Sequence, residues 1–381
     1  MYPPWELRPK DVEIHILNSS VCTSDTHMMD EERVKLVGGV VPGHKIVGKV
    51  IAAGPEALHQ VGDRVGAGVF GGTCLQFEDC EAGYELLCTN EKFVYNSKHK
   101  STCDAPVCGG FSDRIRLDSE FVYKIPDSIP LDEVVPLLCP GATSYAALRR
   151  AGAGPNSVVG IKGIGKMGHL AIQFAKAFGC REIVAFVDSP TLMDDALALG
   201  ADYVVDLHNA DQIKTAIHTI DLMLVNSIDR STSWTDIFHL MVNRGLIVVL
   251  ASTKDPITLP TMELVHRELK VEGLSQGGRR DVGKMLAFAA SHKIRPWLVK
   301  FKLEDFNKAI ELEKKCEARY SIVLEVSDQD PTAPHSEEKR EAAAVAETGE
   351  EPSKVTETPP AETPSAEVKE AKASEAEATV A

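Results

Sequence analysis

The stretch VVGIKGIGKMGH, residues 158–169, decides the fold of this chain. A short β-branched strand runs into the glycine pattern Gly163-x-Gly165-x-x-Gly168, and apolar residues then recur at helical spacing as far as residue 178. A strand that turns through closely spaced glycines into a helix points backbone N–H groups and the positive end of the helix at one place. The stretch therefore predicts a loop that binds the pyrophosphate of a dinucleotide.

An acidic residue after the next expected strand supports this interpretation. Asp188 follows the strand expected at residues 182–187 and stands 20 positions after Gly168. A carboxylate there accepts hydrogen bonds from the adenosine ribose hydroxyls and repels a 2′-phosphate. Residues 189–193 contain no Lys or Arg that could receive such a phosphate. We therefore favour NAD(H) as the cofactor and keep NADP(H) as the alternative.

The pattern of expected elements differs between the two parts of the chain. Before residue 140, short alternating or β-branched runs separated by turns predict a mainly β region. After residue 155, strands and helices alternate, which predicts parallel βαβ units and an α/β protein with a doubly wound parallel sheet. The expected strands of that sheet lie at 158–162, 182–187, 201–205, 222–226, 246–252 and 269–273, and the first helices at 167–178 and 191–199.

Length and charge exclude several classes of protein. At about 150 residues per domain, 381 residues predict about two domains. The net charge is −15 and no stripe of Lys and Arg is present, so we expect no nucleic acid partner. The longest apolar run, residues 246–251, is far shorter than the roughly 20 residues of a membrane helix. The first ten residues lack the apolar core of a signal peptide, and we expect a cytoplasmic protein without a membrane span.

Much of the negative charge lies at the C-terminus. Residues 328–381 contain 14 acidic and 5 basic residues and no aromatic residue, Leu, Ile, Met or Cys. Such a composition cannot bury enough apolar surface to offset the entropy of ordering the chain. We expect a disordered acidic tail over 327–381 that keeps the protein solvated, and a partner-binding segment is the alternative.

Cysteine and histidine residues offer ligands for a metal ion. Nine cysteines, an odd number, favour free thiols or metal ligands over a framework of disulfides. Cys22, His44 and Cys139 together supply two thiolates and an imidazole. Such a set leaves one position of a tetrahedral zinc open, as a catalytic site requires. Each residue alone is ambiguous, because a single buried Cys or His is more often structural.

The order of the motifs resembles a known family. The relevant stretches are Cys22-Thr23-Ser24-Asp25, Gly43 to Gly48 around His44, Pro136-Leu137-Leu138-Cys139 followed by Thr143, and the loop at 163–169. Over about residues 8–326 the chain resembles the zinc-dependent alcohol dehydrogenases of the medium-chain dehydrogenase/reductase superfamily, nearest to the cinnamyl alcohol dehydrogenase branch. This resemblance implies a GroES-like catalytic domain at 1–140 and 276–326, a Rossmann domain at 141–275, and the tail at 327–381.

The resemblance also implies roles for individual residues. Cys22, His44 and Cys139 would bind the catalytic zinc, and Asp25 would orient the His44 ring. Ser24 would relay the proton of the alcohol and His27 would pass it onward, although Ser24 could instead cap a turn and His27 could lie on the surface.

Further implications concern the cofactor, the substrate and the assembly. Gly163, Gly165, Gly168, Asp188 and Thr143 would bind NAD(H) or NADP(H). The substrate would be a small primary alcohol or its aldehyde, and two chains would pair as a homodimer through an edge strand near residues 269–274.

Two departures from the family pattern affect the metal sites. Lys45 replaces a Glu directly after the ligand histidine, so either an ammonium repels the metal ion or Lys45 points away. In the segment that resembles a structural zinc lobe, Cys74, Cys80 and Cys88 stand at the first, third and fourth ligand positions and Phe77 at the second. A carboxylate of Glu78 or Asp79 could complete this incomplete structural zinc site, but we favour loss of its metal. We interpret Cys103 and Cys108 as ordinary free thiols.

Other departures affect the expected substrate and activity. Phe93 stands where the branch has Trp, and Ser321 stands where it has Arg. Phe93 keeps an aromatic wall in the substrate pocket, so an aromatic or allylic aldehyde remains a candidate substrate. The chain also begins later than the family does. Two alternatives therefore stay open. One is a catalytically impaired or non-enzymatic nucleotide-binding member, and the other is a zinc-free quinone or enone reductase.

Overall fold

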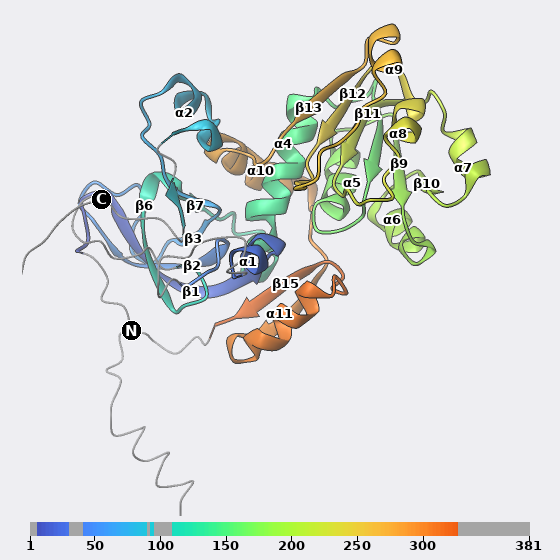
Figure 1. Ribbon diagram of the computed structural model, residues 1–381. Helices are drawn as coiled ribbons and strands as arrows, with labels where there is room; N and C mark the ends of the chain where they lie inside the picture. The colour runs from blue at the N-terminus through green and yellow to red at the C-terminus, as the bar shows by residue number, and fades with distance from the viewer. Residues whose placement is uncertain (1–5, 30–40, 90–91, 95–108, 327–381) are drawn as a thin grey trace, which may run out of the picture. The chain divides into compact units, whose positions relative to one another are not determined.

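The predicted dinucleotide loop follows a central strand of a six-stranded parallel sheet (Figure 1). The strand order is β10-β9-β8-β11-β12-β13, which in chain order is 3-2-1-4-5-6. In such doubly wound sheets the order reverses beside the first strand, and ligands bind at the carboxyl ends of the strands next to that reversal. The strands are β8 (Val158–Lys162), β9 (Glu182–Val187), β10 (Tyr203–Asp206), β11 (Ile220–Val225), β12 (Met241–Val249) and β13 (Lys270–Gly273).

The computed structural model describes residues 6–29, 41–89, 92–94 and 109–326. All of these belong to one unit, Met1–Pro331, and a second unit comprises Thr332–Ala381. The expected acidic tail at 327–381, together with Cys103 and Cys108, lies outside the described residues.

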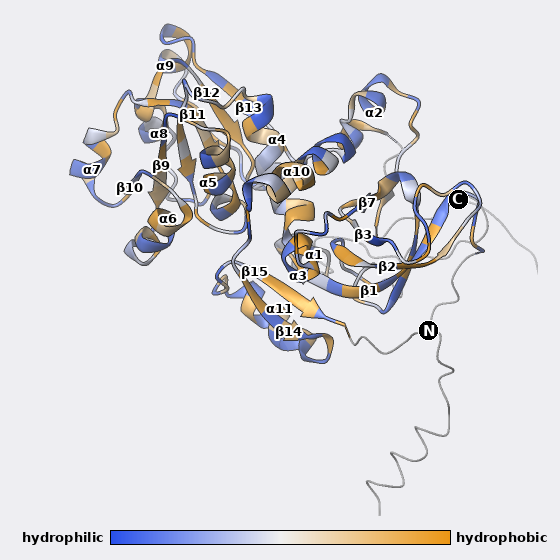
Figure 2. Cartoon of the chain, turned by 180° about the vertical axis from the view of Figure 1, so that it is seen from behind, coloured by the Kyte–Doolittle hydropathy of each residue, from blue (hydrophilic) through white to orange (hydrophobic). Residues whose placement is uncertain are grey.

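The six-stranded sheet is buried on both faces, which explains its uninterrupted apolar strands. In β9, Ile183, Ala185 and Val187 join one apolar core, whereas Val184 and Phe186 join another. Successive side chains of a strand point to opposite faces, so a strand covered on both sides is apolar throughout. The first core includes α5 (Gly168–Ala177) and the second includes α8 (Trp234–Leu240). Figure 2 shows the apolar residues gathered along these strands.

A second sheet combines the beginning of the chain with its later part. Its order is β14-β15-β1-β2-β3-β7, and β6 also pairs with β1. β15 pairs antiparallel with the end of β1, so the chain returns to its first strand after completing the parallel sheet. The strands are β1 (Asp11–Val21), β2 (Ile46–Ala53), β3 (Arg64–Ala67), β6 (Arg114–Asp118), β7 (Val122–Lys124), β14 (Leu298–Lys302) and β15 (Ser321–Glu325). The predicted α/β class with a doubly wound sheet is confirmed, and the domain boundaries at 140, 275 and 326 stay predictions.

Helices and a short hairpin complete the described elements. The hairpin pairs β4 (Phe70–Gly72) with β5 (Lys92–Phe93). Every described helix is too short or too polar to cross a membrane. The remaining helices are α1 (Thr23–Met28), α2 (Glu78–Ala82), α3 (Leu131–Pro136), α4 (Ala142–Arg150), α6 (Met193–Leu199), α7 (Ala210–Thr215), α9 (Thr261–His266), α10 (Arg279–His292) and α11 (Phe306–Lys314).

The largest difference from the expected elements lies in β12. We expected a strand at 246–252, but β12 begins at Met241. Met241 pairs with Ile220 and Leu246 pairs with Leu222, so the residues between them bulge out of the ladder. Arg244 within the bulge has a φ of 64°. A bulge interrupts the period of two that marks a strand in the sequence, which is why the first half of β12 was missed.

His169, at the start of α5, makes the stability of the fold depend on pH. Its ring is fully buried, its Nδ1 donates to the Gly165 carbonyl at 2.9 Å, and the ring stacks on Tyr320 at 4.9 Å. Burial lowers the pKa of His169 from 6.5 to about 4. Between these values the unfolded chain binds a proton that the folded protein does not bind. The stabilisation is therefore complete above about pH 6.5 and is lost as the pH falls towards 4.

We expect the free energy of unfolding to fall by about 3 kcal/mol over this range through His169 alone. Urea unfolding between pH 4.5 and 7.5 measures it, with His169→Phe as the comparison because Phe keeps an aromatic ring against Tyr320. The variant should show a shallower pH dependence. Equal slopes for the two proteins would show that His169 is not the titrating group.

Candidate metal and dinucleotide site

The structure brings Cys22, His44 and Cys139 together from three different elements. Their ligand atoms all lie within 4.8 Å of one another. Cys22 precedes α1, His44 precedes β2, and Cys139 lies in a single π-helical turn between α3 and α4. One ion with bonds of about 2.3 Å to sulfur and 2.0 Å to nitrogen can bridge atoms at these separations, so the donor set fits zinc.

Asp25 holds two members of this group in place. Its Oδ2 accepts a hydrogen bond from the backbone N–H of Cys22 at 2.8 Å, and its Oδ1 accepts one from Nδ1 of His44 at 2.9 Å. Burial works against a charged imidazole, but the Asp25 carboxylate and the Cys22 thiolate together outweigh it and raise the pKa of His44 to about 9. With the proton on Nδ1 directed at Asp25, Nε2 is the nitrogen left to bind a metal ion.

The segment around Cys139 departs from a regular α-helix because of its prolines. Pro136 and Pro140 lack the N–H group that an α-helix needs, and the turn widens between them. The Cys139 carbonyl accepts a hydrogen bond from Thr143 Oγ1 at 3.0 Å. The Cys139 thiol points to Oε1 of Gln276 at 3.8 Å. Thr143 is buried. Its expected role in cofactor binding stays a prediction.

The two thiols of the group differ in acidity. A hydrogen bond from Cys139 lowers the pKa of Cys22 well below its usual value, although burial opposes this shift. The same hydrogen bond, with burial, raises the pKa of Cys139. In the metal-free group, Cys22 is therefore the thiolate and Cys139 keeps its proton. Binding of a metal ion by both sulfurs and by Nε2 of His44 releases that proton and the Nε2 proton of the charged imidazole.

Lys45 is buried beside the group. Its side chain is 0% exposed, and its Nζ donates to Ser20 Oγ at 3.1 Å and to the Val21 carbonyl at 3.3 Å. Burial favours the neutral amine, but the negative charge of the Cys22 thiolate and of the Asp25 and Glu313 carboxylates outweighs it and raises the pKa of Lys45. The charged ammonium therefore contacts Val21, the residue directly before Cys22. It points into the protein and not out to solvent.

We expect Lys45→Gln to bind zinc about tenfold more tightly than the unchanged protein. The buried ammonium and the metal ion are both cations, so the ammonium repels the ion, and tenfold corresponds to about 1.4 kcal/mol. Gln keeps a donor for Ser20 and Val21, whereas Glu would place a carboxylate against the Val21 carbonyl. Competition with a chromophoric chelator measures the affinity. An affinity equal to or below that of the unchanged protein contradicts the repulsion.

Ser24 and His27 both lie exposed on α1, directly after the ligand Cys22. Their spacing of three residues puts them on the same face of the helix. The neighbouring Thr23 donates from Oγ1 to Oε1 of the buried Glu313 at 2.8 Å, and Lys166 of the dinucleotide loop forms an ion pair with the same carboxylate. This contact ties α1 to the loop. The proton relay through Ser24 and His27 stays a prediction.

The glycines of the loop have distinct environments. A Cβ on Gly168 would lie 2.0 Å from the carbonyl oxygen of Gly163, so only glycine fits at this crossing of loop and helix. Among the described residues, nothing beyond its chain neighbours lies within 4 Å of a Cβ built on Gly165. Packing of the protein therefore does not require a glycine there. An open backbone at this place suits the close approach of a pyrophosphate.

Asp188 lies at the carboxyl end of β9, beside a lysine whose position could not be predicted from the sequence. Its side chain is 42% exposed, and its Oδ2 lies 3.8 Å from Nζ of Lys162. Arg319, from the far end of the chain, donates to the Thr191 carbonyl at 3.4 Å and pairs with Asp195 at 3.1 Å. Only the fold brings Arg319 to this segment.

The second cluster of predicted metal ligands also forms. The Cys74 sulfur lies 3.7 Å from that of Cys80 and 3.4 Å from that of Cys88. Backbone hydrogen bonds lower the pKa of Cys74 to about 7, and burial raises that of Cys80 to about 11. Within the described part of the chain, no carboxylate or histidine joins the three sulfurs, and Glu78 and Asp79 are exposed. Completion of the cluster by one of these two carboxylates, like the loss of its metal, stays a prediction.

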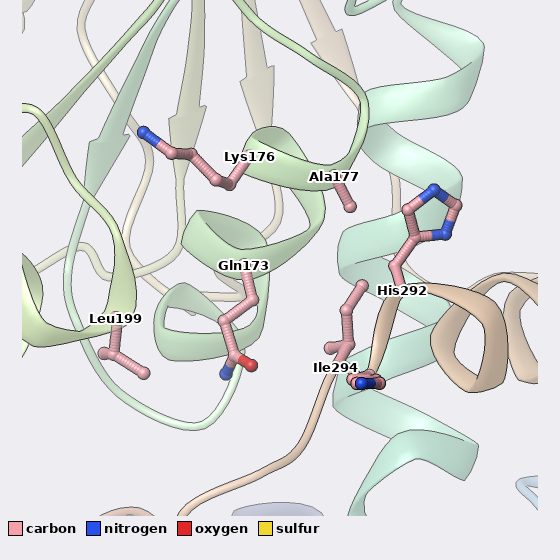
Figure 3. Close-up of a pocket in the computed structure, with 7 residues that line it drawn as sticks. Gln173, Lys176, Ala177, Leu199, His292 and Ile294 are labelled. Atoms are coloured by element: carbon pink, nitrogen blue, oxygen red, sulfur yellow. The ribbon is translucent and has the colours of Figure 1, made fainter. Parts of the chain in front are cut away.

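Other residues considered in the sequence lie outside the ligand groups. Phe93 stacks on Phe70 at 6.2 Å within the β4–β5 hairpin. Ser321 is buried at the start of β15. A surface pocket of about 240 Å³ lies between α5 and the end of α10, where Gln173 and Ala177 face His292 and Ile294 (Figure 3). None of the candidate-site residues lines this pocket.

Comparison with known proteins identifies the family. Residues 8–127 match the alcohol dehydrogenase GroES-like domain, and residues 167–291 match the zinc-binding dehydrogenase domain. A probable mannitol dehydrogenase from Fragaria ananassa is 33% identical, over 85% of this chain and 90% of the relative. An NADP-dependent alcohol dehydrogenase from Mycolicibacterium smegmatis is 33% identical, over 84% and 91%.

A solved structure agrees with these relatives. A cinnamyl alcohol dehydrogenase from Sorghum bicolor superposes with a TM-score of 0.80 at 31% identity, covering 86% of this chain and 94% of that one. The chain belongs to the zinc-binding alcohol dehydrogenase family.

Proposed function

We propose that this protein is a zinc-dependent alcohol dehydrogenase, or aldehyde reductase, that transfers hydride reversibly between a primary alcohol and a nicotinamide cofactor. The observation that carries the proposal is the convergence of Cys22, His44 and Cys139 within 4.8 Å. When bound, zinc lowers the pKa of an alcohol or polarises a carbonyl, and the nicotinamide accepts or supplies the hydride. Cys22, His44 and Cys139 would hold the zinc, and a set of three protein ligands is typical of a catalytic rather than a structural zinc site.

The residues of the chain perform the remaining tasks. Asp25 keeps the His44 ring oriented through its bond to Nδ1. Ser24 accepts the proton of the alcohol, and His27, on the same exposed face of α1, passes it onward. Gly163, Gly165 and Gly168 shape the loop that binds the pyrophosphate, with Thr143 and Asp188 as further cofactor contacts.

The chain's own residues favour NAD(H) over NADP(H). Asp188 would repel a 2′-phosphate, although Lys162 at 3.8 Å offsets part of its charge. Arg319 could attract the phosphate, but Asp195 already pairs with it. The relative from Mycolicibacterium smegmatis is named NADP-dependent, so its name favours NADP(H) instead.

We expect Asp188→Ser to raise the ratio of kcat/KM for NADPH to that for NADH by about tenfold or more. Removing the carboxylate removes the repulsion, and Lys162 is then free to attract a 2′-phosphate. Steady-state rates with each cofactor at varied ionic strength measure the ratio, which should shrink at high salt. The matched control is Asp202→Ser. It also removes a carboxylate that pairs with a lysine, Lys176, but at another place on the sheet. An unchanged ratio in Asp188→Ser contradicts the assignment.

Substrate, assembly and compartment complete the proposal. The aromatic Phe93 supports an aromatic or allylic aldehyde as substrate. β13 is the last strand of the parallel sheet among the described residues, which supports a homodimer through that edge. The described Cys22, Cys139 and Cys180 form no disulfide, which supports the reducing cytoplasm as the compartment.

An assay of the full chain tests the proposed activity. We expect oxidation of NADH that depends on an added aromatic aldehyde, that stops when a chelator removes the metal, and that returns when zinc is added. Reduction of a quinone or an enone that survives metal removal would instead identify a zinc-free reductase. Binding of NADH without turnover of any aldehyde or alcohol would identify a non-enzymatic member of the family.

A further inference from the structure

Lys166, inside the dinucleotide loop, forms an ion pair with Glu313 near the end of α11. We propose that Lys166 is a specificity-determining residue whose ammonium binds the pyrophosphate of the dinucleotide, and that Glu313 competes with the pyrophosphate for this cation. This role rests on the proposed function, because it requires a dinucleotide at residues 163–168. None of the roles assigned above uses the side chain of Lys166.

The position of Lys166 favours contact with a bound pyrophosphate. Lys166 directly follows Gly165, whose open backbone suits the close approach of the phosphates, and it stands two residues before Gly168, where α5 begins. The backbone N–H groups of a loop and a helix N-terminus provide only partial positive charge. A lysine adds a full charge, and it binds phosphates as a point charge. The loop therefore carries a cation suited to a doubly charged pyrophosphate.

The stability of the protein gives little reason for this ion pair. The side chain of Lys166 is 17% exposed and that of Glu313 is 4% exposed. Taking two charges out of water costs about as much free energy as their attraction returns, so such a pair adds little net stability. An apolar residue in place of Lys166 would avoid this cost. Recognition of an anion, in contrast, requires the positive charge.

Glu313 is placed to release the ammonium when a pyrophosphate binds. It lies in the last turn of α11, where the helix dipole disfavours a carboxylate. Its Oε1 also accepts a hydrogen bond from Thr23 Oγ1 at 2.8 Å, so Glu313 keeps a partner when Lys166 turns to the phosphates. The flexible stem of a lysine lets its ammonium exchange one anion for another while the backbone stays in place. Glu313 therefore keeps Lys166 near the loop and lowers the affinity of the loop for phosphates.

Calorimetric titration of the full-length protein with ADP-ribose tests the proposal, because ADP-ribose carries the pyrophosphate but takes no part in hydride transfer. We expect Lys166→Met to weaken binding about tenfold. The loss should shrink as the salt concentration rises, because salt screens the attraction between the ammonium and the phosphates. Glu313→Gln should bind ADP-ribose at least about twofold more tightly, since Gln keeps an acceptor for Thr23 and leaves the ammonium to the phosphates.

The double variant Lys166→Met/Glu313→Gln separates binding of the phosphates from a purely structural role. If Lys166 served only to neutralise the buried Glu313, removal of both charges would restore the affinity of the unchanged protein. We expect the double variant instead to bind ADP-ribose at least about threefold more weakly than the unchanged protein. The double variant leaves neither charge of this pair buried alone, so it carries the test if Lys166→Met does not fold.

The matched control is Lys176→Met, which removes another lysine of α5 that pairs with a carboxylate, Asp202, at 3.1 Å. It should bind ADP-ribose as the unchanged protein does. Unchanged affinity in Lys166→Met at every salt concentration, or full affinity in the double variant, would overturn the role of Lys166 and leave the proposed activity intact. Failure of the unchanged protein to bind both ADP-ribose and NADH would overturn the dinucleotide site itself, and the role of Lys166 with it.

Discussion

Cys139→Ala is expected to lose bound zinc and to lower kcat/KM for aldehyde reduction by at least about 10³-fold. Changes to residues that only orient a metal ligand typically cost 10–100-fold, and Cys139 is proposed as a ligand itself. The substitution leaves one sulfur and one imidazole, a pair that holds zinc far less tightly than the full set of three. Metal content by mass spectrometry and steady-state kinetics on the same preparation measure both effects.

The matched control for this prediction is Cys180→Ala. Cys180 is also half-buried, and it lies in the parallel sheet region outside both sulfur groups. This control should keep its zinc and its activity. Full zinc content together with full activity in Cys139→Ala would show that the metal is bound elsewhere.

Gly165→Ala is expected to weaken dinucleotide binding by about tenfold or more while leaving the stability of the protein nearly unchanged. No positive φ requires a glycine here, and a Cβ at this position meets nothing of the described protein within 4 Å. Its methyl group would instead occupy the space that a pyrophosphate needs. Fluorescence titration with NADH measures the affinity, and urea unfolding measures the stability.

Gly154→Ala provides the comparison, because a Cβ on Gly154 would also meet nothing of the described protein within 4 Å. Gly154 lies in the turn before β8, at the opposite end of the strand from the dinucleotide loop. It should alter neither quantity beyond a few tenths of a kcal/mol, the usual range for a surface change. Binding of NADH to Gly165→Ala as tight as to the unchanged protein would place the pyrophosphate elsewhere.

The features predicted correctly from the sequence depend on local patterns. The strand, the glycines and the helix at 158–169 lie next to one another in the chain, and the apolar strands of a sheet buried on both faces have a recognisable composition. Asp188 was found because its distance from Gly168 along the chain is itself part of the pattern. The cysteine and histidine motifs were found through their resemblance to a family.

The features that were missed depend on contacts between distant residues. Gln276 reaches the Cys139 thiol, and Arg319 reaches Thr191, only because the chain folds back after the parallel sheet. The charge of Lys45 could be read from the sequence, but its burial and its bonds to Ser20 and Val21 could not. The bulge in β12 was missed because it breaks the alternation on which strand prediction relies.

Metal analysis of the purified full-length protein tests the central claim most directly. The account predicts one zinc ion per chain, retained through dialysis and displaced only by a strong chelator. Folded protein that contains no zinc, and that binds none when zinc is supplied, would contradict the assignment of Cys22, His44 and Cys139 as its ligands.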